Sequence, residues 1–176
     1  MNPYVVIDIG GTSIKYGLAD AEGQLIETHE MPTEAQKGGP HILKTTNEIV
    51  ARYLKKHALA GVAISSAGMV DPDKGEIFYA GPQIPNYAGT QFKKEIEEAF
   101  QLPCEIENDV NCAGLAEVTT GHAIGSNNAV CLTIGTGIGG CLLLDGQVFH
   151  GFSNSACEVG YLHLPDGAFQ DLASTT

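Results

Sequence analysis

A chain of 176 residues, 43% of them hydrophobic and 17% charged, can bury the core of one domain or of two small ones. Its formal net charge of −12 at pH 7 argues against nucleic acids and anionic membranes as partners, because both would repel it. No apolar run approaches the about 20 residues of a transmembrane helix, and no signal peptide is recognisable, so we expect a cytoplasmic protein. The five cysteines are widely spaced, and no C-x-x-C pair occurs, which favours reduced core thiols over disulfides or zinc ligands.

The first two thirds of the chain are predicted to alternate strands and helices. Ile42, Ile49 and Tyr53 recur at helical spacing, and the basic residues that follow suit a helix C-terminus. Asn108 is a plausible N-cap for the last helix of this part. The predicted elements, in order, are strands over 4–9, 14–19 and 24–30, a helix over 41–57, strands over 61–65 and 75–79, a helix over 90–100, a strand over 104–107 and a helix over 109–120.

A second set of three strands follows, over 129–134, 138–144 and 147–150. Asp145 and Gly146 form a good hairpin turn between the last two. We expect a loop over 158–164 and a weakly patterned tail after it. The order β-β-β-α-β-α-β-α and then β-β-β indicates an internal duplication that is cut off partway. The sequence therefore predicts an α/β fold with one lobe over 1–120 and an incomplete second lobe of the same type over 121–176.

Two glycine turns that connect strands are the strongest chemical signal. In the first, Asp8-Ile-Gly-Gly-Thr-Ser-Ile-Lys15, the glycines lack a Cβ, so backbone N–H groups can approach a phosphate. Thr12 and Lys15 can add donors, and Asp8 can hold Mg²⁺ through water. Residues 132–140 repeat this arrangement. One such turn alone is more often a plain hairpin, and no Walker loop occurs. The pair predicts a nucleotide held between two lobes.

Five segments carry a family resemblance, and they follow one another in the family's order over nearly the whole chain. They are residues 8–12 with Lys15, 65–71, 106–113 with Glu117, 132–140 and 158–161. Taken together, these segments resemble the ROK sugar-kinase family, which has the actin-like ATPase (ribonuclease H-like) architecture. The resemblance implies ATP- and Mg²⁺-dependent phosphorylation of a sugar hydroxyl, with the sugar in the cleft between lobes.

A carboxylate must accept the proton of the sugar hydroxyl, because that hydroxyl is a poor nucleophile. Asp109 is the predicted catalytic base, at a strand-to-helix junction; the alternative is that it only caps the helix. The resemblance implies a set of sugar contacts: Gly68, Asn86, Asn108, Asp109, Glu158 and Tyr161. Gly68 could instead serve only a turn, and Glu158 could be a solvated carboxylate. The phosphate contacts implied are Gly10, Gly11, Thr12, Lys15, Gly135, Thr136 and Gly137, with Asp8 near Mg²⁺.

One departure from the family pattern concerns zinc. Many members carry Glu-x-Gly-His, whose histidine binds sugar and a structural zinc, but Tyr161 stands here, and the cysteine-rich zinc run is absent. Cys157 and His163 are only two ligands, too few for a tetrahedral site, so we predict no zinc. The zinc-free branch includes β-glucoside kinases, which makes the 6-hydroxyl of a β-glucoside the predicted target. Glucokinase, fructokinase and N-acetylmannosamine kinase are the alternatives within the family.

The other departure is length. Family kinases continue into an adenosine pocket and a returning helix, so we expect this chain to be a truncated form with an exposed sheet edge. A sugar-responsive regulator and a non-catalytic sugar-binding module are the alternatives of other classes. The regulators carry a DNA-binding segment before the kinase part; because this chain is acidic and starts a few residues before its first strand, we expect a kinase and not a regulator. Dimerisation is a family expectation.

Overall fold

The computed structural model describes residues 2–135 and 137–173. The chain forms two compact units, Met1–Asp109 and Val110–Thr176. No helix within the described residues is long and apolar enough to cross a membrane. The functional lobes predicted over 1–120 and 121–176 stay a prediction.

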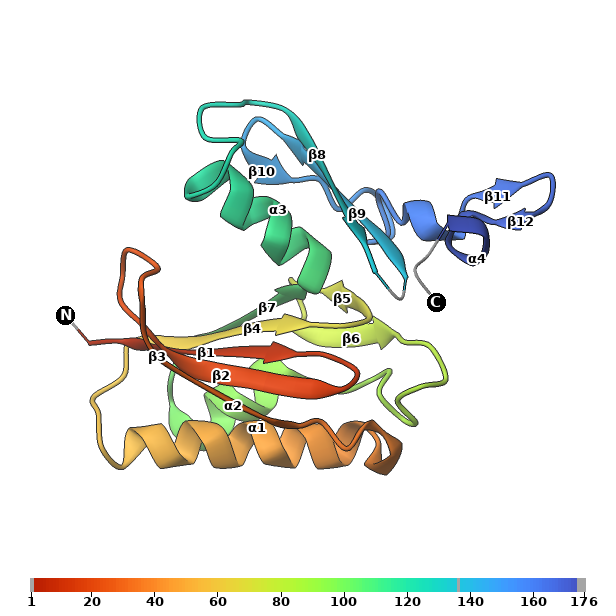
Figure 1. The fold of residues 1–176 in the computed structure, drawn as a ribbon. Coiled ribbons are helices and arrows are strands. Elements are labelled where there is room, and N and C mark those ends of the chain that lie inside the picture. Colours follow the sequence, from red (N-terminus) through yellow and green to blue (C-terminus); the bar gives the residue numbers. More distant parts are fainter. Residues whose placement is uncertain (1, 136, 174–176) are drawn as a thin grey trace. The chain divides into compact units, whose positions relative to one another are not determined.

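A five-stranded sheet organises the first unit, with the strand order β3-β2-β1-β4-β7 (Figure 1). Strands β1, β2 and β3 pair antiparallel, whereas β1, β4 and β7 pair parallel. The carboxyl ends of β1, β4 and β7 therefore lie at the same edge of the sheet. The unit contains β1 (Tyr4–Ile9), β2 (Ser13–Ala19), β3 (Leu25–Pro32), η1 (Ala35–Lys37), α1 (Gly39–Leu54), β4 (Gly61–Ser66), β5 (Met69–Asp71), β6 (Glu76–Tyr79), α2 (Phe92–Phe100) and β7 (Cys104–Asn108).

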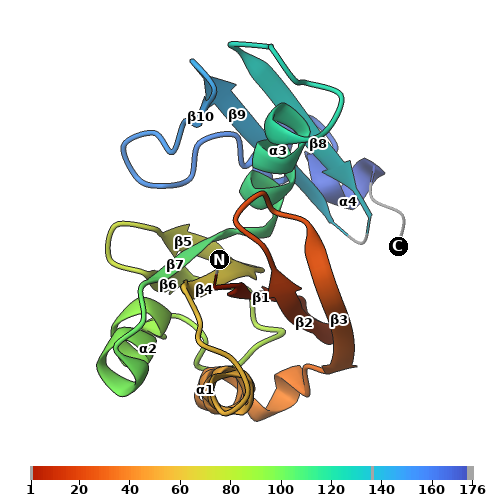
Figure 2. The same cartoon turned by 90° about the vertical axis from the view of Figure 1, so that its left-hand side faces the viewer.

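The core of the first unit lies on one face of this sheet. Helices α1 and α2 cover that face (Figure 2). Val5, Ile7 and Ile9 of β1 point toward it and are buried, because alternate residues of a strand share a face. Ile42 and Ile49 of α1 are buried against them. Each such side chain contributes about 1.5–3 kcal/mol when fully buried.

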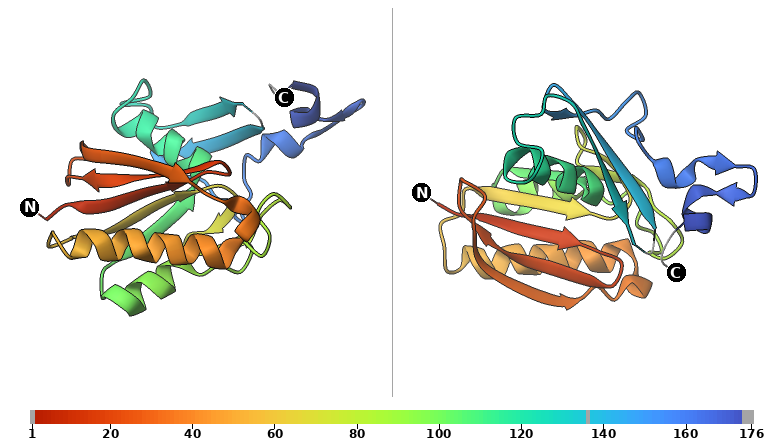
Figure 3. Two further views of the ribbon diagram at one scale, coloured as in Figure 1. Left: turned by 60° about the horizontal axis from the view of Figure 1, so that its bottom comes forward. Right: turned by 45° about the horizontal axis from the view of Figure 1, so that its top comes forward.

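An antiparallel sheet of three strands, in the order β10-β9-β8, forms the centre of the second unit. Asp145 and Gly146 both have positive φ, 51° and 75°, as the predicted hairpin turn requires. Figure 3 shows the long β8–β9 hairpin and, beyond it, the small β11–β12 hairpin beside α4. The elements are α3 (Asp109–Thr119), β8 (Ala129–Ile134), β9 (Ile138–Leu144), β10 (Gln147–Val148), η2 (Val159–Tyr161), β11 (His163–Leu164), β12 (Gly167–Ala168) and α4 (Phe169–Ala173).

The predicted strands and helices are confirmed to within a few residues, with three differences. No strand is predicted between those over 61–65 and 75–79, yet β5 forms there and pairs with β6. Helix α1 begins at Gly39, before Pro40, and ends at Leu54, with Lys55 as its C-cap residue. The loop expected over 158–164 contains η2 and β11, and the tail after it, expected to be weakly patterned, contains β12 and α4. Strands of two or three residues are too short to give a periodic signal.

Candidate active site

One row of polar residues crosses the sheet of the first unit near the ends of its parallel strands. Asp8 of β1 pairs in register with Ser65 of β4, and Ser65 pairs with Glu107 of β7. Lys15 of β2 lies opposite Asp8 on its other side. Residues paired in register share a face, so these side chains gather on the face opposite Ile7 and Ile9. The Ser65 hydroxyl donates to Asp8 Oδ1 at 2.8 Å, which holds the carboxylate in place.

The first glycine turn connects β1 to β2 directly beside this row. The Gly10 amide donates to the Ser13 carbonyl at 3.0 Å, and the buried Thr33 hydroxyl donates to the Gly10 carbonyl at 2.7 Å. Gly11 and Thr12 are exposed. Neither glycine has a positive φ, and a Cβ on Gly11 would meet nothing within 4 Å. Neither φ therefore requires a glycine, although a Cβ on Gly10 would lie only 3.1 Å from the Ser13 carbonyl oxygen. Gly11 leaves its side of the turn open to a ligand, as a phosphate contact needs.

Asn108 and Asp109 stand where β7 ends and α3 begins. The Asn108 side-chain amide donates to Asp109 Oδ1 and to the Gly68 carbonyl, both at 2.9 Å. The Asn108 backbone amide donates to Glu107 Oε1 at 2.7 Å. Asp109 is the first residue of α3, and the positive end of a helix dipole favours an ionised carboxylate. The geometry gives Asp109 one fixed carboxylate oxygen at a helix N-terminus.

Gly68 holds the other end of this contact, on the loop between β4 and β5. Its φ of 93° lies in the left-handed region, where a side chain is strained. An added Cβ would also lie 3.0 Å from the Tyr79 carbonyl oxygen. Both facts explain a glycine at this position, which presents its carbonyl to Asn108.

Asn86 lies on the exposed loop between β6 and α2, with a φ of 53°. Its neighbour Tyr87 is buried, and the Tyr87 hydroxyl lies 2.6 Å from Ser66 Oγ. Ser66 donates to the Ala67 carbonyl at 2.9 Å, so Tyr87 is the donor in this pair. Burial, together with the charge of Asp109, raises the pKa of Tyr87 and keeps that proton in place, although the Ser66 bond acts against it.

The Ser66–Tyr87 pair ties the Asn86 loop to the end of β4, and the sequence reasoning missed it. The available signal was Ser65-Ser66, two consecutive hydroxyl residues at the end of a buried strand. No local pattern pointed to Tyr87 as the partner, since it lies 21 residues away on an irregular loop.

The second unit contains the other predicted phosphate turn, between β8 and β9. The Gly135 amide donates to the Gly137 carbonyl at 2.9 Å, which closes a tight turn. Thr136, predicted as a phosphate contact, lies outside the described residues. As at Gly11, a Cβ on Gly135 would meet nothing within 4 Å.

Glu158 and Tyr161 flank a single turn of 3₁₀ helix in the same unit. The Tyr161 amide donates to the Glu158 carbonyl at 3.2 Å, and the Tyr161 side chain is half exposed. A Cβ on Gly160, between them, would clash with the Ile138 carbonyl oxygen. The turn therefore packs against the first residue of β9, the strand that follows the glycine turn of Gly135 and Gly137.

The described residues show no cluster of three or more His, Cys, Asp or Glu side chains that could hold a metal ion. A single carboxylate such as Asp8 nevertheless suits Mg²⁺, which usually keeps several waters and takes one or two carboxylates plus phosphate oxygens. The expectations about zinc and magnesium both stay predictions.

The structure thus brings together most of the predicted residues within each unit. At one edge of the first sheet lie Asp8, Gly10, Gly11, Thr12, Lys15, Gly68, Asn108 and Asp109, with Asn86 on the loop that Tyr87 anchors. In the second unit, Gly135 and Gly137 form one turn, and the turn of Glu158 and Tyr161 packs against Ile138, the residue that follows Gly137. The individual roles of these residues stay predictions.

Comparison with known proteins identifies the family to which the chain is similar. Residues 4–171 match the model of the ROK family. An uncharacterized protein of Clostridium perfringens is 51% identical over all 176 residues, which make up 60% of that protein. The beta-glucoside kinase of Klebsiella pneumoniae is 36% identical over 156 residues, or 88% of this chain and 50% of that enzyme. The chain therefore spans about half to 60% of the length of such relatives.

A solved structure gives the same answer for the fold. The ROK family glucokinase of Streptomyces griseus, in complex with glucose and AMPPNP, superposes with a TM-score of 0.84 at 29% identity. The match covers 98% of this chain and 57% of that one. It confirms the predicted α/β architecture of the actin-like ATPases. Fold, motif order and family match agree: the chain belongs to the ROK family.

Proposed function

We propose that this chain carries the catalytic base and the main sugar and phosphate contacts of an ATP-dependent sugar kinase. The observation that supports it best is the Asn108–Asp109 pair. An amide anchored on the Gly68 carbonyl holds one oxygen of a carboxylate at a helix N-terminus. Beside it, at the same edge of the sheet, lies the row of Asp8, Ser65 and Glu107.

In the proposed reaction, a sugar hydroxyl oxygen attacks the γ-phosphorus of ATP and forms a new P–O bond, while the bond from that phosphorus to the β,γ-bridging oxygen breaks. The hydroxyl proton passes to Asp109, and ADP leaves with the bonding electrons. Mg²⁺, held by Asp8 through water, would neutralise part of the phosphate charge when bound. The open backbone at Gly11 and the Lys15 ammonium contact phosphate oxygens.

The remaining assignments rest on the family motifs. We assign the sugar hydroxyls to Asn108, Glu158 and Tyr161, with the loops of Gly68 and Asn86 alongside. The turn of Gly135, Thr136 and Gly137 is the second phosphate contact.

The 6-hydroxyl of a β-glucoside is the proposed target. Tyr161, in place of the family's zinc-binding histidine, supports this choice, as does the resemblance to the beta-glucoside kinase of Klebsiella pneumoniae. Free glucose is the second candidate, because the superposed glucokinase of Streptomyces griseus holds glucose. A panel of cellobiose, glucose, fructose and N-acetylmannosamine, with ADP release measured by a coupled assay, separates them. Equal activity on monosaccharides with none on cellobiose would overturn the β-glucoside assignment.

Asp109→Asn tests the base. A positioned acid–base group contributes about 10²–10⁴-fold in rate, so turnover should fall by that order with the fold intact. Asp73→Asn, at an exposed turn, is the matched control and should leave turnover unchanged. Both variants are made in this chain and in a chimera that continues with the C-terminal part of the Clostridium perfringens relative. Turnover by Asp109→Asn equal to that of the parent would refute the assignment, and no sugar-dependent ADP release in either parent would favour a non-catalytic role.

A further inference from the structure

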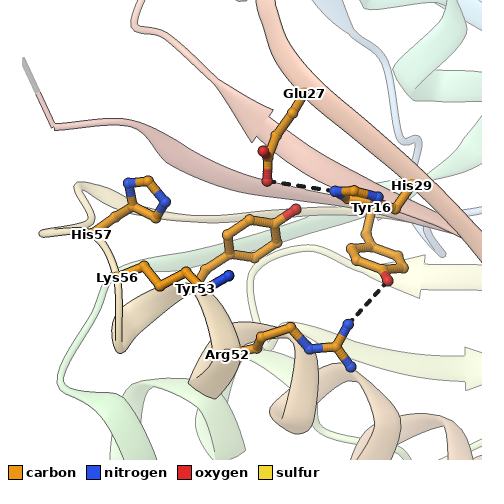
Figure 4. Close-up of a pocket in the computed structure, with 7 residues that line it drawn as sticks. All are labelled: Tyr16, Glu27, His29, Arg52, Tyr53, Lys56 and His57. Carbon is orange, nitrogen blue, oxygen red and sulfur yellow. Dashed lines mark hydrogen bonds and ion pairs between the residues drawn. The ribbon is translucent and has the colours of Figure 1, made fainter.

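A second pocket lies in the first unit, away from the candidate active site. It is a cavity of about 240 Å³ between the outer strands β2 and β3 and the C-terminal end of α1 (Figure 4). Tyr16 and His29, which pair in register, line it from the strands, and Arg52 and Lys56 line it from the helix side. The C-terminal end of α1 leads into the start of β4, which is at the sheet edge opposite the one where Asn108 lies. The pocket is therefore toward that edge, on the face of the sheet that the helices cover.

The pocket gathers cations in a chain of net charge −12 that has only nine lysines and arginines. The Arg52 guanidinium donates to the Tyr16 hydroxyl at 3.2 Å and lies 6.0 Å from the centre of its ring, which fixes its position. Lys56 and the imidazole of His57 extend the basic side. Glu27 is the carboxylate in the lining, and its Oε1 lies 3.6 Å from His29 Nε2.

A buried hydroxyl in the wall of this pocket lacks a partner. Tyr53 is only 5% exposed, and among the described residues its hydroxyl has no hydrogen-bond partner. Figure 4 shows it pointing toward the side of Glu27 and His29. Burial first, and then the Glu27 carboxylate, raise the pKa of Tyr53, so the group stays a proton donor at neutral pH. The Tyr53 hydroxyl, on the side of Glu27, is thus a donor that an acceptor in the pocket can use.

We propose that this pocket binds a small phosphorylated molecule, with its phosphate between Arg52 and Lys56. Arginine is favoured for phosphate because its planar guanidinium donates two parallel hydrogen bonds. The Tyr16 and Tyr53 rings with the Glu27 carboxylate suit a hydroxylated body beyond the phosphate. A volume below the about 300–1,000 Å³ of drug-sized sites limits the ligand to the size of inorganic phosphate or a hexose phosphate.

The simpler role of these cations is to stabilise the negative C-terminal end of α1. Lys55 provides the comparison, because it is the C-cap residue of α1 but does not line the cavity. If these cations only stabilised the helix, replacing Lys55 and replacing Lys56 would change phosphate binding by the same amount. If the pocket binds phosphate, replacing Lys56 weakens binding and replacing Lys55 does not.

The test is an NMR titration of the imidazole resonances of His29 and His57, which report on this pocket and not on the sheet edge near Asp109. Inorganic phosphate and glucose 6-phosphate are added separately at constant ionic strength, with glucose as the neutral control. We expect saturable shifts with one or both phosphates and none with glucose. Tighter binding of glucose 6-phosphate identifies a sugar phosphate as the ligand, and equal binding identifies phosphate alone.

Variants locate the contacts. Arg52→Gln and Lys56→Gln should each weaken binding about tenfold or more, as expected for loss of a charge-assisted hydrogen bond. Tyr53→Phe should weaken it a few-fold while the protein stays folded. Lys55→Gln should leave it unchanged. The absence of saturable shifts, or the same loss in Lys55→Gln as in Lys56→Gln, would overturn the proposal.

Discussion

The buried pair of Ser66 and Tyr87 offers a quantitative test of how the Asn86 loop is held. Both side chains are essentially inaccessible, at 0% and 1% exposure, and their hydroxyl oxygens lie 2.6 Å apart. Ser66 also donates to the Ala67 carbonyl, whereas Tyr87 donates to Ser66. The two truncations are therefore not equivalent.

Ser66→Ala leaves the Tyr87 hydroxyl buried without this partner, which costs about 1–3 kcal/mol. Tyr87→Phe removes one hydrogen bond but leaves Ser66 its bond to the Ala67 carbonyl, so the loss is about 0.5–1.5 kcal/mol. The phenyl ring still packs edge-to-face on Phe92, with ring centres 6.1 Å apart. In the double variant neither hydroxyl remains, so its loss should be smaller than the sum of the two by about 1 kcal/mol.

Urea unfolding followed by circular dichroism measures these losses. With an m-value of about 2 kcal/mol/M, a loss of 2 kcal/mol lowers the midpoint by about 1 M. Tyr79→Phe, which removes an exposed tyrosine hydroxyl, is the control and should change stability by less than about 0.5 kcal/mol. Strict additivity of the two truncations, or a Tyr87→Phe loss larger than that of Ser66→Ala, would refute the donor assignment.

Three further predictions concern the first unit. Gly68→Ala should lower the free energy of unfolding, measured by thermal denaturation, by about 1–3 kcal/mol. Gly89→Ala should lower it less, because Gly89 has a similar φ but open space around it. Equal losses would mean that the Tyr79 carbonyl is not close to Gly68. Cys104, whose pKa burial raises to about 12, should react with a thiol reagent only after unfolding, and fast labelling of the native chain at this residue would contradict its burial. The hydrogen bond from the Lys74 ammonium, at 2.7 Å, lowers the pKa of Asp71 below its usual 3.8, so this bond stabilises the fold above about pH 4 and is lost as the pH falls further. Asp71→Asn should make the free energy of unfolding depend less on pH below about pH 4. The change should be small, and smaller still in high salt, because Lys74 is exposed. An unchanged pH dependence would mean that this bond does not contribute to stability.

Features of this fold that depend on neighbouring residues could be predicted from the sequence, whereas features that depend on residues far apart in the chain could not. Strands β1, β4 and β7 and the turn at Asp145 follow from residues next to one another, and their prediction is confirmed. The hydrogen bond from Ser65 to Asp8 joins residues 57 positions apart, and that from Asn108 to Gly68 spans 40. Each depends on the register between strands, which no local pattern specifies. Short strands such as β5 form because a partner is present, and so they escaped prediction.

The row across the sheet shows why a register is informative about function. Strands of a parallel sheet that is buried on both faces are apolar almost throughout. Strand β1 is not: Ile7 and Ile9 face the core, whereas Asp8 between them faces a serine at 2.8 Å. A half-buried carboxylate must be paired to be tolerated, and an apolar residue at this position would need no such partner. The fold therefore places a paired carboxylate on the half-buried face of β1, at the edge where the glycine turn is open. Polar groups held in this way are expected where a site has been selected for binding.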